Sequence, residues 1–108
     1  MSQTVETMPD AEEVMRRLTA CDDDPYMVEK LYPRIVNQLA GRELTGSGVV
    51  MGLTLAISDY GADLGDIHGP IVTKTLMIRL GHLVKHLLGD SKVLSDAQAD
   101  LRELGITT

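Results

Sequence analysis

Residues 70–88 restrict the fold most, because their apolar and polar side chains separate onto two faces of a helix. One face is aliphatic and consists of Val72, Leu76, Leu80, Leu83, Val84 and Leu87, joined by Met77 and Leu88. The other face carries Lys74, Thr75, Arg79, His82, Lys85 and His86. Pro70 is typical of a helix start and Gly89 of a helix end. Gly81 costs about 1 kcal/mol relative to Ala, too little to interrupt this pattern. We therefore predict one continuous amphipathic helix over 70–88.

Capping signals predict two shorter helices near the ends of the chain. Asp10, with Glu13 three residues later, is typical of an N-terminal capping box and predicts a helix over 10–20. Ser95 and Gln98 have the same spacing and predict a last short helix.

A further helix is predicted over 25–40. Asp24 is a favourable N-cap, and Pro25 suits the first helical position. An unbroken apolar stripe runs through Pro33, which removes one backbone hydrogen bond and predicts a kink. Gly41 would end this helix.

Residues 49–64 fit two descriptions, because a short apolar run can form a strand or a buried helix. A strand near 48–58 could pair across a dimer. The helix is favoured because the pattern is long for a strand. In addition, Gly48, Gly52 and Ala56 recur every four residues, which would let another helix approach closely.

The composition agrees with helix-on-helix packing. The 108 residues include no Trp, no Phe and only three Tyr, so the core must be aliphatic. We predict an all-α bundle of four to five helices whose core is built by 25–40, 49–64 and 70–88. It would form a single domain over 9–108, after a disordered tail over 1–8. The alternative is an α+β domain with a strand near 48–58.

Charge is unevenly distributed in this acidic chain, whose net charge is −6. The acids concentrate in residues 1–24, whereas 67–89 holds Lys74, Arg79 and Lys85 and no acid. This basic face could pack on the acidic N-terminal helix, within one chain or between two. It also leaves nucleic-acid binding as an alternative function, with Arg42 and Lys92 as further contacts. Net acidity makes nucleic acid an unfavoured partner.

Cys21 is the single cysteine, so no internal disulfide can form. Together with the lack of a secretion-signal pattern, this predicts a reducing, cytoplasmic location. No apolar run approaches the roughly eighteen residues that cross a bilayer, so we expect no membrane association. The neighbouring acids Asp22–Asp24 predict an unreactive thiol that packs in the core.

His82 and His86 lie four residues apart, a spacing at which two imidazoles can bind one divalent metal ion. A zinc protease is excluded, because the glutamate that its motif requires after the first histidine is missing. A metal site would need a further ligand, for which His68, Asp59 and Asp63 are candidates. The simpler interpretation is two histidines on a solvated helix face, without any cofactor.

Two other polar segments match known binding motifs poorly. The acids within 59–66 lack the spacing of an EF-hand loop, and we interpret them as a solvated helix end. Residues 45–48 lack the lysine of a phosphate-binding loop and fit a linker or N-cap better.

Met51, Leu55 and Ile78 lie off the main apolar faces and are the predicted interface residues. Such surplus apolar positions indicate self-association, most simply as a two-fold dimer, or a protein partner. No catalytic arrangement is recognisable from spacing. We therefore predict a non-enzymatic interaction or regulatory domain that acts as a homodimer. A small metal-binding protein is the first alternative, and nucleic-acid binding through Lys74, Arg79 and Lys85 is the second.

Overall fold

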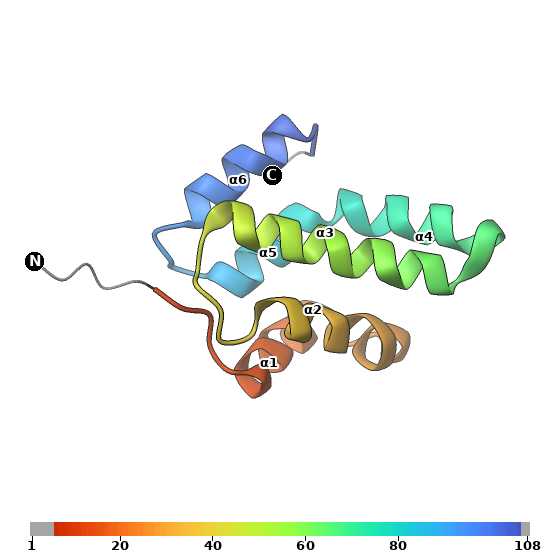
Figure 1. Cartoon of the computed structure of the whole chain (residues 1–108), viewed down its shortest axis with the longest axis horizontal. Coiled ribbons are helices and arrows are strands. Elements are labelled where there is room, and N and C mark those ends of the chain that lie inside the picture. The colour runs from red at the N-terminus through yellow and green to blue at the C-terminus, as the bar shows by residue number, and fades with distance from the viewer. Residues whose placement is uncertain (1–5, 107–108) are drawn as a thin grey trace, which may run out of the picture.

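A computed structural model describes residues 6–106 of the chain, which form six α-helices and one π-helical segment (Figure 1). In chain order they are α1 (Ala11–Cys21), η1 (Met27–Leu31), α2 (Tyr32–Leu39), α3 (Gly46–Asp63), α4 (Gly65–Ile78), α5 (Leu80–Leu88) and α6 (Leu94–Glu103). The predicted all-α class is confirmed, with more helices than the four to five expected. The alternative strand near 48–58 is wrong, because these residues lie inside α3.

The N-terminal ends of three helices follow the rules for capping side chains. Asp10 Oδ1 accepts the Glu13 N–H at 3.0 Å, although the Glu13 side chain turns to Arg16 and does not complete a capping box. The Asp24 side chain likewise accepts the Tyr26 N–H at 2.9 Å. Thr45 Oγ1 accepts the Gly48 N–H at 3.0 Å, so Thr45 is the N-cap of α3 and the next three residues form its first turn.

The capping box predicted at Ser95 and Gln98 is wrong. The residue before α6 is Val93, and no side chain within residues 6–106 caps this helix. Ser95 already lies within the first turn. The chain enters α6 through a turn in which Ser91 accepts the Val93 N–H on its hydroxyl at 3.4 Å and the Leu94 N–H on its carbonyl oxygen at 3.2 Å.

The irregularity predicted at Pro33 takes the form of a π-helical turn. The Tyr32 N–H donates to the Met27 carbonyl oxygen, five residues back, at the end of η1. Pro33 follows directly and has no N–H to continue a regular ladder. Gly41, with φ of +71°, follows the end of α2 as predicted.

The prediction of one continuous helix over 70–88 is wrong. The segment belongs to two helices, α4 and α5, which are separated at Arg79 (φ −89°, ψ 1°). Pro70 also lies inside α4, which begins at Gly65. The break lets α4 pack along α3 while α5 turns to pack against α1 and α6.

The core is aliphatic and is shared by the helices, with α3 packed against α2, α4 and α6 (Figure 1). The apolar face expected over 70–88 is largely buried despite the break: Leu76, Leu80, Leu83, Val84, Leu87 and Leu88 all belong to the core. Tyr32 is fully buried and donates its hydroxyl to the Asp22 carbonyl oxygen at 2.5 Å. Gly52 meets the side chain of Leu39, which confirms that its small size lets α2 approach.

The segment before α1 pairs with the connection between α2 and α3. Residues 1–5 of the predicted tail lie outside the described residues. The Met8 N–H donates to the Arg42 carbonyl oxygen at 2.8 Å, and the Leu44 N–H donates to the Glu6 carbonyl oxygen at 2.7 Å. The Met8 side chain is buried, so residues 6–8 are part of the packed structure. Among residues 6–106, no helix is both long and apolar enough to cross a membrane.

Candidate functional site

Helix α4 leaves three isoleucines exposed on one side. Ile67, Ile71 and Ile78 are 77%, 66% and 68% exposed. Together with Lys74 they are spaced four, three and four residues apart, so the four side chains share one narrow stripe. The buried Leu76 lies nine residues, or two and a half helical turns, after Ile67 and therefore on the opposite side of the helix, so the stripe points away from the core. We call these four residues the isoleucine stripe.

The interface residues predicted from the sequence are exposed but divide between two surfaces. Met51 and Leu55 are 59% and 49% exposed on α3. Ile78 lies on α4, nine residues after Gly69, whose backbone contacts α3. Nine residues correspond to two and a half helical turns, so Ile78 points away from α3. Ile78 therefore belongs with the isoleucine stripe and not with Met51 and Leu55.

The predicted basic face also divides. Lys74 lies in the isoleucine stripe, and Lys85 lies on α5. Arg79 lies at the break, with Nη1 3.4 Å from Asp22 Oδ2. Helix α1 does pack against α5 within the chain, and the Asp22–Arg79 ion pair lies beside this contact.

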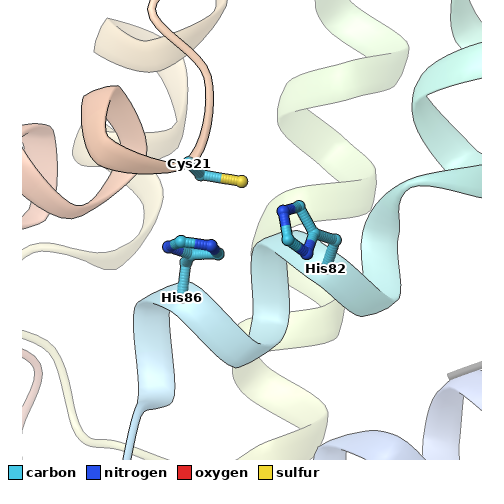
Figure 2. Close-up of side chains that lie close together, drawn as sticks. All are labelled: Cys21, His82 and His86. Carbon is cyan, nitrogen blue, oxygen red and sulfur yellow. The ribbon is translucent and has the colours of Figure 1, made fainter.

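The second candidate site is a cluster of Cys21, His82 and His86 (Figure 2). Cys21 is the last residue of α1, and the histidines lie one turn apart on α5. One ligand atom from each residue lies within 4.8 Å of the other two. The two imidazole rings have centroids 4.6 Å apart and planes at 75°. The structure thus joins the predicted histidine pair to a thiol from another helix.

Packing of α1 on α5 holds this cluster together. Val14 and Leu18 of α1 are fully buried. Arg17 Nη1 donates to the Leu87 carbonyl oxygen at 2.6 Å, which ties the two helices directly. Because α1 packs against α5 and this bond joins them, the end of α1 lies opposite the histidines.

The surroundings of the Cys21 thiol favour its protonated form when no metal ion is bound. Burial raises its pKa, the Asp22 carboxylate adds to this effect, and the Arg79 guanidinium opposes it. Cys21 packs against the core but is only partly buried, so a cation can reach its sulfur. Binding of such a cation would favour the thiolate.

The additional ligands proposed from the sequence lie elsewhere. Asp59 and Asp63 both bind Arg34, the first at 2.5 Å from Nη1. His68 lies on α4 and is not part of the cluster. Sequence reasoning missed Cys21 because it is far from the histidines along the chain, and no local spacing connects them.

A pocket of about 530 Å³ adjoins the cluster and reaches the side chains of Cys21 and His82. Its apolar wall includes Met27, Tyr32, Leu76, Ile78 and Leu83, and its polar rim includes Asp22, Arg79 and Lys85. Pockets of this size and character are typical of small-molecule sites. A second hollow of about 610 Å³ shares Met27, Leu76 and Arg79 and extends toward His68.

Comparisons with protein-family models, with curated proteins and with solved structures found no match to this chain.

Proposed function

We propose that this protein is a non-enzymatic interaction domain that forms a homodimer through α4. The exposure of Ile67, Ile71 and Ile78 along a single stripe is the observation that carries this proposal. Burying an isoleucine side chain contributes about 1.5–3 kcal/mol. Three aligned isoleucines on the solvent side of a helix therefore favour an apolar partner surface.

The spacing of the isoleucine stripe supports a helix as the partner. Steps of four, three and four residues match the a and d positions of a heptad, the pattern by which two helices pack side by side. Lys74 takes one of these positions. Its aliphatic stem can cover apolar surface while its amine reaches water, and a polar residue in such a seam fixes the register.

The charges around the stripe favour an antiparallel second copy. Asp66 lies beside its first residue, whereas Arg79 directly follows its last. In an antiparallel pair the acidic end of each α4 faces the basic end of its partner, but a parallel pair would bring like charges together. Two-fold symmetry then places Ile67 of one copy opposite Ile78 of the other.

The stripe is short, so we expect weak association. Stable interfaces bury roughly 1,200–2,000 Å² in total, more than four side chains on each side provide. The dimer should therefore form at high micromolar concentration. We place it in a reducing, cytoplasmic setting, in keeping with the unpaired Cys21.

Sedimentation equilibrium over a range of protein concentrations tests this proposal. We expect a reversible monomer–dimer equilibrium that Ile71→Asp abolishes, because two carboxylates would be buried in the seam. Leu55→Asp on α3 is the matched control, since this exposed residue lies off the stripe, and it should leave the equilibrium unchanged.

A wild-type protein that stays monomeric at high micromolar concentration would overturn the proposal. Dimerisation that is sensitive to Leu55→Asp but not to Ile71→Asp would place the interface on α3 and refute the role of α4.

A further inference from the structure

We propose that Cys21, His82 and His86 form a binding site for one divalent metal ion of the zinc class. Its three ligands lie outside the isoleucine stripe, although Ile78 also lines the adjoining pocket, and metal binding does not depend on self-association. It uses the histidine pair on α5 and a thiol that only the packing of α1 brings within reach.

The three side chains have the donor chemistry that such ions prefer. A cysteine thiolate and neutral imidazoles are the usual ligands of Zn²⁺, and Co²⁺ accepts the same set. Calcium and magnesium are disfavoured, because they require oxygen ligands. The carboxylate of Asp22 is occupied: one oxygen accepts the Asp24 N–H at 3.0 Å and the other lies 3.4 Å from Arg79.

The distances between the three donor atoms are close to those in a site with a bound metal ion. In a tetrahedral zinc site with bonds of about 2.0–2.3 Å, neighbouring donor atoms lie roughly 3.3–3.7 Å apart. The donor atoms of the cluster are within 4.8 Å of one another. His82 is exposed, so its side chain has room to rotate toward the other two donors.

The backbone that carries the ligands is fixed by contacts that the ligands themselves do not make. Leu18 is fully buried one turn before Cys21, and Leu83 and Leu87 are buried beside the two histidines. The bond from Arg17 to the Leu87 carbonyl oxygen joins the same two helices. Metal binding therefore does not have to organise the site, which lowers its entropic cost.

Three protein ligands leave a fourth position open, as in zinc sites that bind water or an exogenous ligand. The pocket beside Cys21 and His82 provides room for that ligand. Met27, Leu76 and Leu83 line it with apolar surface. The fourth ligand is thus expected to be water or the donor atom of a small molecule, and not another side chain.

Titration of the untagged, reduced protein with Co²⁺ tests the site, because a cobalt–thiolate bond gives a charge-transfer band in the near ultraviolet. We expect the band to saturate at one Co²⁺ per chain and to disappear when Zn²⁺ is added. Cys21→Ser should eliminate the band. His82→Ala and His86→Ala should each weaken affinity at least about 100-fold, more than the loss of an outer hydrogen-bond partner typically causes.

His68→Ala is the matched control, since His68 is an exposed histidine outside the cluster, and its titration should equal that of the wild type. Ile71→Asp should also bind Co²⁺ normally, which separates this site from self-association. Far-ultraviolet circular dichroism without metal verifies that each variant is folded.

The absence of a thiolate band in the wild type would overturn the proposal. So would a band that survives Cys21→Ser, or one that His68→Ala removes. Thermal unfolding adds an independent measurement: Zn²⁺ should raise the melting temperature of the wild type, and the increase should vanish in folded His82→Ala.

Discussion

The backbones of α3 and α4 touch at Gly61 and Gly69, where a Cβ added to Gly69 would lie 2.3 Å from the Gly61 carbonyl oxygen. No side chain fits between the helices at this point. The two glycines are therefore required for space, and they let α4 lie along α3 as the extended hairpin visible in Figure 1. This arrangement also turns the isoleucine stripe toward solvent.

Gly69→Ala should destabilise the protein by about 1–3 kcal/mol, because the new methyl group must push two backbones apart. Alanine has the higher helix propensity by about 1 kcal/mol, so propensity alone predicts the opposite sign. Urea denaturation measures the difference. Ser58→Ala, on an exposed position of α3, serves as the control and should change stability little. An unchanged or increased stability of Gly69→Ala would show that the helices are not in backbone contact.

Arg34→Lys should lower the free energy of unfolding more than Arg16→Lys does, and much of this effect should be lost in high salt. Arg34 binds Asp59 and Asp63 at the end of α3, and its Nε donates to the Lys30 carbonyl oxygen at 2.9 Å. A lysine ammonium cannot reproduce this planar set of bonds. Denaturation of both proteins at low and high ionic strength is the measurement.

Arg16→Lys provides the comparison for that experiment. Arg16 pairs with Glu13 within α1 and its side chain is 71% exposed, so this substitution should have little effect at either salt concentration. Equal losses in the two variants would contradict a special role for Arg34.

Tyr32→Phe should reduce stability near neutral pH by about 1 kcal/mol, because it removes the hydrogen bond to the Asp22 carbonyl oxygen. Burial also raises the pKa of the Tyr32 phenol, and the Asp22 carboxylate adds to this. The stabilisation is therefore complete below the unfolded pKa of about 10 and is lost as pH rises further, since the unfolded chain releases the proton first. Denaturation at several alkaline pH values should show a shallower decline in Tyr32→Phe than in the wild type. Parallel declines would contradict the effect of burial.

Lys74→Ile should strengthen the proposed self-association by about tenfold or more, because a polar residue in a helical seam reduces its stability. Sedimentation equilibrium gives the dissociation constant. Lys85→Ile places the same new side chain on an exposed position of α5, outside the stripe, and should not tighten association. A Lys74→Ile protein with unchanged association would argue against the proposed seam.

Local rules predicted much of the helical structure. Asp10 and Asp24 cap α1 and the helical run after Pro25 because their carboxylates accept nearby N–H groups. Gly41, Gly89 and Gly105 follow helix ends with positive φ, a conformation that glycine adopts without strain. These caps and helix ends depend on neighbours within four residues, so the amino-acid sequence alone predicts them.

The division of 70–88 could not be read in this way. Its apolar residues keep the spacing of one helix face on both sides of Arg79, and most of them are buried. The position of the break depends on two sets of neighbouring helices, because α4 packs against α3 whereas α5 packs against α1 and α6. A periodic pattern shows which side of a helix is buried but not whether its two halves face the same neighbour.

The amino-acid sequence by itself determined the helical class, the aliphatic core and the placement of His82 and His86 one turn apart, because these follow from composition and local spacing. The tertiary structure alone decided that Cys21 joins the two histidines and that the face of α4 with Ile67, Ile71 and Ile78 stays exposed, away from Met51 and Leu55. Both results depend on how α1 and α3 pack against α5 and α4. Contacts between residues so far apart in the chain are set by the fit of whole helix surfaces, which no local pattern encodes.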